Sequence, residues 1–290
     1  MSDNSYHVPV MLKEVVEKLN IKPNGTYVDG TLGGGGHAQA ILEKLSPEGK
    51  LIGIDTDQDA LAAAKLRLAN YANVEYIHNN FRNIKKILTA PVDGILLDLG
   101  GSSYQINEAS RGFSIQNDGP HDMRLDQSEP LTAEVVVNEY SEEELVKIFK
   151  EWGEERFSTR VARAIISARK SQRINSTFAL KTLIENAIPT WRKRESVTRI
   201  FQALRITVNE ELTSLANFLN DAIDVLNPEG RLVVMAYHSL EDRLVKQTFR
   251  QAKAEEKITI LTKKPLMAEL EETSINSRAR SAKLRAGEKT

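Results

Sequence analysis

Short apolar runs alternate with helical patterns through the first hundred residues, and this alternation is the strongest constraint on the fold. Between the runs, residues 37–45 and 58–68 carry apolar side chains three and four positions apart, the spacing of one helical face. Strands that alternate with helices in this way form a parallel sheet covered by helices. The sequence therefore predicts an α/β fold. The runs of strand length are TYVD (26–29), LIGID (51–55), VEYIH (74–78) and DGILLD (93–98).

Helical signatures replace this pattern after about residue 104. Ser141 is followed three residues later by Glu144, which is the spacing of a capping box at a helix start. Residues 161–168 place apolar side chains on one helical face. We therefore expect an all-helical domain over residues 105–205, inserted into the α/β domain.

The α/β pattern returns beyond the insert. A long helix is expected from about Val208 to Leu226, where the turn sequence NPEG (227–230) ends it. The runs RLVVMAY (231–237) and ITIL (258–261) are typical of further strands. Residues 1–104 and 206–290 would then form one cofactor-binding domain. Its last residues, after Asn276, are a basic tail.

The near-neutral net charge of −1 hides a segregation of charge along the chain. Residues 150–205 carry 13 Lys/Arg and 5 Asp/Glu, a net charge of +8, which leaves 26 basic and 35 acidic residues, a net charge of −9, elsewhere. A concentrated positive segment is the usual electrostatic signature of a polyanion site. The helical insert is therefore the part of the chain expected to contact nucleic acid.

Composition also sets aside several classes of protein. The chain has no cysteine and five scattered histidines without an HExxH pair, so neither a disulfide framework nor a metal site is suggested. The N-terminal residues lack the pattern of a secretory signal, and the longest apolar runs have strand length rather than membrane length. We expect a soluble cytoplasmic protein with no membrane partner.

Four consecutive glycines, Gly33 to Gly36, follow the first predicted strand directly. Such a run is either a slack linker or a turn whose backbone must come close to a ligand. Its place between a strand and a helix favours the turn, because open α/β sheets bind ligands there. The segment from Gly33 to Ala38 also satisfies a relaxed dinucleotide-binding fingerprint, although an incidental turn could do so as well.

Two acidic residues at predicted strand ends extend this candidate site. Asp55 lies 22 residues after Gly33 and could accept hydrogen bonds from the ribose hydroxyls of an adenosine cofactor, or instead cap the following helix. Asp98 ends the fourth strand, and burial of an unpaired acid is costly, so we expect its carboxylate at the edge of the cleft. With Asp29, it gives the cleft a negative character. A sulfonium suits that character better than a pyrophosphate, which favours S-adenosylmethionine over NAD.

The chain resembles the RsmH (MraW) family of bacterial 16S ribosomal RNA methyltransferases from residue 7 to residue 281. The segments that carry the resemblance are TLGGGGHA, GIDTD, DGILLDLGGSS, RGFS, DGPHDMRLD, GEER, TRIFQALRITVNEEL and YHSLEDRLVK. The resemblance implies a class I methyltransferase fold (a Rossmann-like α/β sheet) with an inserted helical domain, S-adenosylmethionine as the cofactor and the small ribosomal subunit as the partner. It also implies methylation at N4 of one decoding-centre cytidine, cytidine 1402.

The same resemblance assigns cofactor contacts residue by residue. It places Asp55 at the ribose, Phe81 beside the adenine, and Asp98 and Gln105 near the methionine end, with the loop contacts at Gly35, Gly36 and His37. The chain also departs from the family pattern at Gly34, at Gly101, at His121, where Leu is usual, and at Glu195-Ser196-Val197, where His-Pro-Ala is usual. The last departure puts the RNA contact of that segment in doubt.

Two residues are candidates for the chemistry. A cytidine N4 is a poor nucleophile because its lone pair is delocalised into the ring, so an acceptor for its hydrogens would help. Asp98 is the first candidate acceptor, although the Pro-Pro-aromatic sequence of many amino-methyltransferases does not follow it. His238 is the second, and its alternative role is to cap the next helix alongside Ser239.

Several charged residues are candidates for binding RNA. The target base must leave its stack to expose N4, so the contacts we expect position the backbone rather than read bases. Each group also has an ordinary alternative: a solvated loop, a solvated helix face or a disordered end. The loop candidates are Arg111, Asp122, Arg124 and Asp126; the helical candidates are Arg156, Arg160, Arg163, Arg199 and Arg243; the tail candidates are Arg278, Arg280, Lys283 and Arg285.

Two other functions fit parts of the sequence. An NAD-linked oxidoreductase would account for the glycine fingerprint alone. A non-catalytic RNA or ribosome binder would account for the basic segment alone. Neither accounts for the glycine loop, the two strand-end acids and the basic insert together, and the sequence does not indicate an oligomeric state or a DNA partner.

Overall fold

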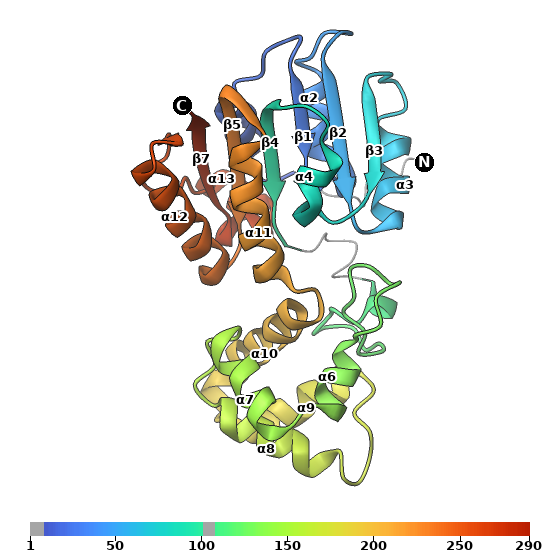
Figure 1. The fold of residues 1–290 in the computed structure, drawn as a ribbon. Helices are drawn as coiled ribbons and strands as arrows, with labels where there is room; N and C mark the ends of the chain where they lie inside the picture. The colour runs from blue at the N-terminus through green and yellow to red at the C-terminus, as the bar shows by residue number, and fades with distance from the viewer. Residues whose placement is uncertain (1–8, 101–107) are drawn as a thin grey trace. The chain divides into compact units, whose positions relative to one another are not determined.

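The computed structural model describes residues 9–100 and 108–290 and divides into two compact units (Figure 1). The first unit combines Met1–Ser102 with Leu212–Thr290, and the second is Ser103–Glu211. Each has its own hydrophobic core. Among the described residues, no helix is both long and apolar enough to cross a membrane.

A seven-stranded sheet forms the centre of the first unit, in the order β3-β2-β1-β4-β5-β7-β6. The strands from β3 to β5 pair in parallel, while β7 runs antiparallel to both β5 and β6. The predicted α/β class is confirmed. The strands are β1 (Thr26–Asp29), β2 (Lys50–Asp55), β3 (Val74–His78), β4 (Val92–Asp98), β5 (Leu226–Ala236), β6 (Ile258–Ile260) and β7 (Lys283–Lys289).

Strand β7 corrects the expectation of a basic tail, for which a disordered end was the alternative. It lies inside the sheet, and its alternate residues Leu284 and Ala286 are fully buried against the core. Arg285 between them is also buried and pairs with Asp242, with 2.7 Å between Nε and Oδ1. The strand was missed because its basic residues dominate its composition, although the apolar residues still alternate as in a half-buried strand.

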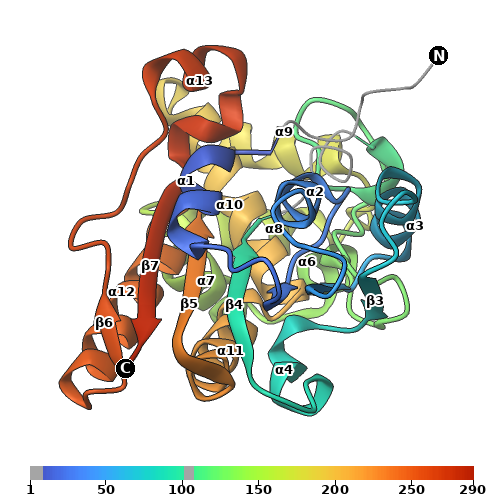
Figure 2. The ribbon, with the colours of Figure 1, turned by 90° about the horizontal axis from the view of Figure 1, so that it is seen from above.

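Helices cover both faces of the sheet, as Figure 2 shows from above. On one face, Tyr27, Leu51 and Leu96 pack against α1, α2 and α3. On the other face, Ile95 and Leu97 pack against α4, α11 and α12. The helices are α1 (Leu12–Leu19), α2 (Gly36–Leu42), α3 (Gln58–Arg67), α4 (Ile84–Ile87), α11 (Glu211–Asp224), α12 (Ser239–Ala254) and the short α13 (Leu270–Ile275).

In the described part of the second unit, residues 108–211, the regular elements are helices, while residues 112–132 form a long loop with one isolated bridge from Pro120 to Ser176. The predicted capping box is present: Ser141 Oγ accepts from the Glu144 amide at 3.2 Å, and Glu144 Oε2 accepts from the Ser141 amide at 2.8 Å. Its helices are α6 (Ala133–Glu139), α7 (Glu142–Glu151), α8 (Ser158–Ala168), α9 (Thr177–Ala187) and α10 (Lys193–Val208), with the 3₁₀ turns η2 (Ala109–Arg111) and η3 (Thr190–Arg192).

The helix expected to begin near Val208 starts later. Helix α10 ends at Val208, and α11 begins at Glu211 after Glu210, whose φ of 48° is left-handed. The Asn209 side chain accepts from the Leu125 amide at 2.8 Å and donates to the Met123 carbonyl at 2.8 Å. The break therefore satisfies backbone groups of a distant loop, which apolar periodicity alone does not reveal.

Candidate active site

The four-glycine run joins β1 to α2 in a defined turn. Gly33 and Gly35 adopt φ angles of 50° and 76°, in the left-handed region where side chains are unfavourable. The Gly35 amide donates to the Leu32 carbonyl at 2.8 Å, and a Cβ at Gly35 would lie 3.3 Å from Leu68. Among the residues that the structure describes, the nearest atom to a Cβ at Gly33 would be the Thr31 carbonyl oxygen at 3.9 Å. Within that part of the chain, the turn is packed at Gly35 and open at Gly33, as a loop that admits a ligand requires.

Asp55, at the end of β2, holds this turn in place. Its Oδ2 accepts from the Gly33 amide at 2.8 Å, and its Oδ1 accepts from the Asp57 amide at 2.9 Å. The alternative role of Asp55 as a helix cap is wrong, because Asp57 caps α3 and accepts from the Asp59 amide at 3.0 Å. A carboxylate has about four acceptor positions, so Asp55 keeps capacity for ribose hydroxyls.

Asp98, at the end of β4, is held by groups from three other segments. Its Oδ1 accepts from the Tyr237 hydroxyl at 2.7 Å, and its Oδ2 lies 3.6 Å from Nδ1 of His37. Its backbone amide donates to Oγ1 of Thr31 at 2.6 Å. Nε2 of His37 lies 2.9 Å from the carbonyl oxygen of Val10, which fixes the plane of the imidazole. The carboxylate is thereby fixed in position beside the glycine turn.

Tyr237 is a site residue that the sequence analysis missed. Burial and the nearby Asp98 carboxylate raise the pKa of its hydroxyl well above the usual value, so the hydroxyl keeps its proton and donates it. The Arg278 guanidinium lies 5.1 Å from the centre of its ring. An aromatic residue at the end of a predicted strand, directly before His238, was the available signal.

Three carboxylates meet where the parallel strands β1, β2 and β4 end side by side. Burial is the main cause that raises the pKa of Asp29 to about 7, and Asp98 and Asp55 add to it by repulsion. Burial also raises the pKa of Asp55 to about 6. A bound cation would relieve this repulsion and favour the ionised forms.

His238 serves as the N-cap of α12. Its Nδ1 accepts from the Glu241 amide at 3.4 Å, and Glu241 Oε2 accepts from the amides of Tyr237 and His238 at 2.8 and 3.3 Å. Nε2 of His238 lies 3.1 Å from Glu241 Oε1. The capping alternative is therefore present. With the Nδ1 lone pair so used, the geometry favours Asp98 over His238 as a proton acceptor.

The remaining predicted cofactor contacts are distributed as follows. Gly36 is the first residue of α2, and a Cβ there would lie 3.3 Å from Pro9. Phe81 begins a 3₁₀ turn (η1, Phe81–Asn83) after β3, and its half-buried ring meets Phe218 edge-on, with 5.3 Å between ring centres. Gln105 lies outside the described residues.

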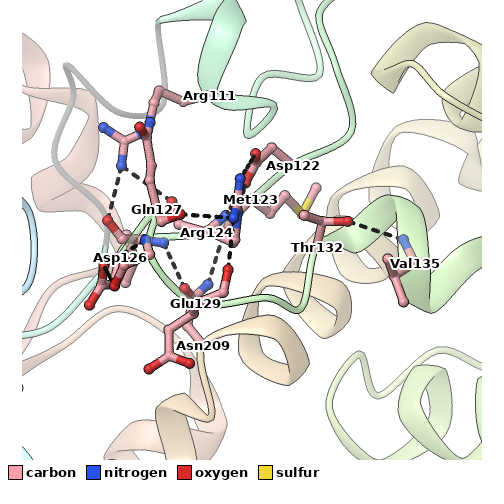
Figure 3. Close-up of polar contacts among 12 residues, drawn as sticks. Arg111, Asp122, Met123, Arg124, Asp126, Gln127, Glu129, Thr132, Val135 and Asn209 are labelled. Atoms are coloured by element: carbon pink, nitrogen blue, oxygen red, sulfur yellow. Dashed lines mark hydrogen bonds and ion pairs between the residues drawn. The ribbon is translucent and has the colours of Figure 1, made fainter.

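The predicted polar cluster of the helical unit stabilises its own loop (Figure 3). Arg124 donates to both carboxylate oxygens of Asp122 at 2.8 Å and to the carbonyls of Gln127 and Glu129 at 2.8 and 2.7 Å. Arg111 is buried and donates to the carbonyls of Arg124 and Leu125 at 3.2 and 3.1 Å. These contacts give Arg111, Asp122 and Arg124 a structural role in the loop, and their contact with RNA stays a prediction.

The basic candidates differ in how they are engaged. Arg199 Nη2 pairs with Glu195 at 2.7 Å, and Arg163 pairs with Glu142 at 2.9 Å. Arg243 is exposed near the start of α12. The exposed side chains of the helical unit remain candidates for phosphate contact, whereas Arg285 in β7 is too buried for it.

The sheet order, the glycine turn after β1 and the acids that end β1, β2 and β4 together define an S-adenosylmethionine-dependent methyltransferase of class I. Residues 4–290 match the MraW methylase family. The chain belongs to that family.

Similar proteins agree with this assignment. The chain is 50% identical over 300 residues to the ribosomal RNA small subunit methyltransferase H of Clostridium botulinum (strain Kyoto / Type A2), covering 96% of this chain and 97% of that protein. The protein of the same name from Carboxydothermus hydrogenoformans is 46% identical over 305 residues, covering 98% and 97%. A crystal structure from Clostridium thermocellum, described as a candidate rRNA methylase, aligns over 98% of this chain and 97% of its own with a TM-score of 0.50. At 12% identity, it shows the fold alone.

The raised carboxyl pKa values predict a pH-dependent preference for the charged cofactor. Asp29 ionises as the pH rises through about 7, so its attraction for the sulfonium is absent at low pH and present above that value. S-adenosylhomocysteine, the product, lacks the positive charge on sulfur. We expect the ratio of the two affinities, methyl donor over product, to rise by up to about tenfold between pH 5.5 and pH 8. Calorimetry at several pH values measures both affinities.

The matched variant for this prediction is Asp29→Asn. It removes the titrating charge at a position whose Oδ1 accepts from the Thr31 amide at 3.2 Å, a bond that asparagine can keep. The affinity ratio of this variant should be nearly independent of pH. An unchanged pH dependence in the variant would contradict the role of Asp29.

Proposed function

We propose that this protein transfers a methyl group from S-adenosylmethionine to N4 of the decoding-centre cytidine of 16S ribosomal RNA, cytidine 1402. The names of its relatives, at 46–50% identity, support the small-subunit RNA as the substrate class. The observation that carries the proposal is the fixed Asp98 carboxylate beside the glycine turn. An amine that must lose a proton needs an acceptor of this kind.

The residues around the turn fit the cofactor. The open space at Gly33 allows close approach of a ligand to the backbone, and Asp55 offers acceptors for ribose hydroxyls. Phe81 supplies an apolar surface for the adenine at the end of β3. When bound, the cofactor supplies an electrophilic methyl group on a positively charged sulfur.

Asp98 makes the exocyclic amine more nucleophilic by accepting one of its hydrogens. The Tyr237 hydroxyl occupies one acceptor position of Oδ1 and leaves others on both oxygens. Because the Tyr237 hydroxyl keeps its proton, it donates to Asp98 and orients the carboxylate. Positioning of this kind lowers the barrier, since little rearrangement is then needed as the reaction proceeds.

The helical unit supplies the RNA-binding surface in this proposal. Its segment 150–205 carries a net charge of +8, and Arg156 and Arg160 on and just before α8 are exposed. Contacts of this kind with phosphates give affinity and register without reading sequence. The target cytidine is presented unpaired, because a paired base hides its N4 edge.

The test is methyl transfer to small ribosomal subunits from cells that lack this gene. The purified protein and labelled S-adenosylmethionine should label one cytidine, and mass spectrometry of RNA fragments should place the methyl group on N4. Subunits from cells that carry the gene are the control and should accept little label. Labelling on a ring carbon or a ribose, or at another nucleotide, would contradict the proposed target.

A second candidate function, a ribosome binder without activity, predicts a different outcome in the same assay. The protein would bind subunits with the salt dependence of a polyanion site but transfer no methyl group. The intact arrangement of Asp98, Tyr237 and the glycine turn favours the enzyme.

A further inference from the structure

Trp191 is the most exposed large aromatic residue among those the structure describes. Its side chain is 74% exposed in the 3₁₀ turn η3, between α9 and α10. An indole is large and apolar, so leaving it in water is unfavourable, and exposed aromatic residues of this kind are enriched at binding sites. The exposed indole therefore indicates a binding site for a partner molecule.

The surroundings of Trp191 are strongly basic. Residues 190–199 contain four basic residues and one acidic residue, Glu195. The Arg192 guanidinium lies 4.7 Å from the centre of the indole ring, and the same side chain pairs with Glu195. Arg199 pairs with Glu195 from the next turn of α10, at 2.7 Å. The indole thus projects from a positive surface. Such a surface favours a polyanion as the partner over a basic or neutral one.

We infer that Trp191 is a stacking platform for an unpaired base of the RNA substrate, with the surrounding basic residues drawing in its phosphates. This surface rests on the proposed function, because it names a second contact of the same substrate. Aromatic stacking accepts any base and adds affinity for single strands, while a duplex keeps its bases stacked on one another. The platform therefore distinguishes unpaired RNA from duplex RNA.

Glu195 reduces the positive charge of this surface, and a substitution at Glu195 can test the effect. It occupies Arg192 and Arg199 at once, and these arginines, with Arg156 nearby, lower the pKa of the Glu195 carboxyl, chiefly through the hydrogen bond from Arg192. The acid is therefore ionised at neutral pH and cancels one positive charge. Removing its charge should release both guanidinium groups toward phosphates.

The test uses Trp191 as its own reporter. The chain has two tryptophans, so Trp152→Phe leaves Trp191 as the single indole. A short unstructured RNA oligonucleotide should quench its fluorescence, and the same strand in a duplex should not. In the full chain, Trp191→Ala should weaken single-strand binding about tenfold without changing its salt slope, and Trp191→Phe should retain most of the affinity.

Two charge variants separate stacking from electrostatics. Glu195→Gln should raise the affinity for the same oligonucleotide several-fold and steepen its salt dependence. Glu134→Gln is the matched control, because Glu134 lies in the same unit and pairs with Arg173 at 2.6 Å, so it removes the same charge from an ion pair that includes neither Arg192 nor Arg199. Leu270→Ala controls for loss of an exposed apolar side chain, since Leu270 is 88% exposed in the other unit.

Methyl transfer to small subunits is measured in parallel. Transfer to cytidine N4 with no quenching and no loss of affinity in Trp191→Ala overturns this inference and leaves the proposed function standing. Self-association of the protein that depends on Trp191, without an RNA response, also overturns it and makes a second copy the partner. Absence of transfer overturns the proposed function, whereas quenching by unpaired RNA still supports the platform.

Discussion

Replacing Asp98 with asparagine is expected to lower kcat for methyl transfer by about 10²- to 10⁴-fold. Asparagine keeps an acceptor for the Tyr237 hydroxyl but puts an NH₂ group where the second carboxylate oxygen lies. That group cannot accept a hydrogen from the cytidine amine, and the negative charge that assists its loss is gone. Single-turnover labelling of small subunits measures the rate, and calorimetry with S-adenosylhomocysteine shows whether the pocket is intact.

Tyr237→Phe is the companion variant, because it removes only the hydroxyl that orients Asp98. Its kcat should fall less, by about tenfold, because Oδ1 of Asp98 loses the 2.7 Å contact that orients the carboxylate. The affinity for S-adenosylhomocysteine should stay within about twofold, whereas a disrupted pocket would lower both. If Asp98→Asn transfers methyl groups within a few-fold of the unchanged protein, another group accepts the proton and the assignment fails.

The sequence indicated the parallel half of the sheet because each of its strands carries a continuous apolar run bounded by turn residues. The strand-end acids followed from that prediction, since the carboxyl ends of parallel strands lie at one edge. Asp55 and Asp98 could be placed in this way before any contact was known. Their contacts could not be predicted, because Tyr237, which donates to Asp98, lies 139 positions away along the chain.

The failures have physical causes of the same kind. The composition of β7 is that of a basic tail, and only its pairing between β5 and β6 makes it a strand. The sequence did not show that the charges of the Arg111 loop also satisfy backbone carbonyls within the loop, as Figure 3 shows, and their contact with a substrate stays a prediction. The sequence alone does not distinguish a charged residue that binds backbone groups of its own loop from one that binds a ligand.

His121 is a buried polar residue of the helical unit that its surroundings do not satisfy. It is 1% exposed, and neither ring nitrogen has a hydrogen-bond partner among the described residues. Its ring lies 5.7 Å from that of Phe201, centre to centre. Burial lowers the pKa of His121 to about 4, so the ring is neutral in the folded protein at neutral pH. The family pattern has leucine here, a side chain of similar size without polar atoms.

We expect His121→Leu to raise the free energy of unfolding by about 1–3 kcal/mol at pH 7.5, because it removes an unsatisfied buried polar group. Denaturant unfolding followed by circular dichroism measures the change, with the unfolding of the helical unit fitted separately if two transitions appear. His78→Leu is the control, since His78 is exposed and water can replace the contact of its Nε2 with the Thr56 carbonyl oxygen at 2.9 Å. The control should leave the stability within about 1 kcal/mol.

The advantage of His121→Leu should grow as the solution becomes more acidic. A folded pKa of about 4, below the ordinary 6.5, means that the unfolded chain binds the proton more readily. The stability of the unchanged protein is therefore lost as the pH falls from about 6.5 toward 4, and this histidine alone contributes about 2 kcal/mol of loss between pH 7.5 and pH 5. Leucine removes that contribution while every other group titrates as before. A stability difference between the two proteins that stays constant over this range would mean that His121 finds a partner for its proton, and that the buried ring is satisfied after all.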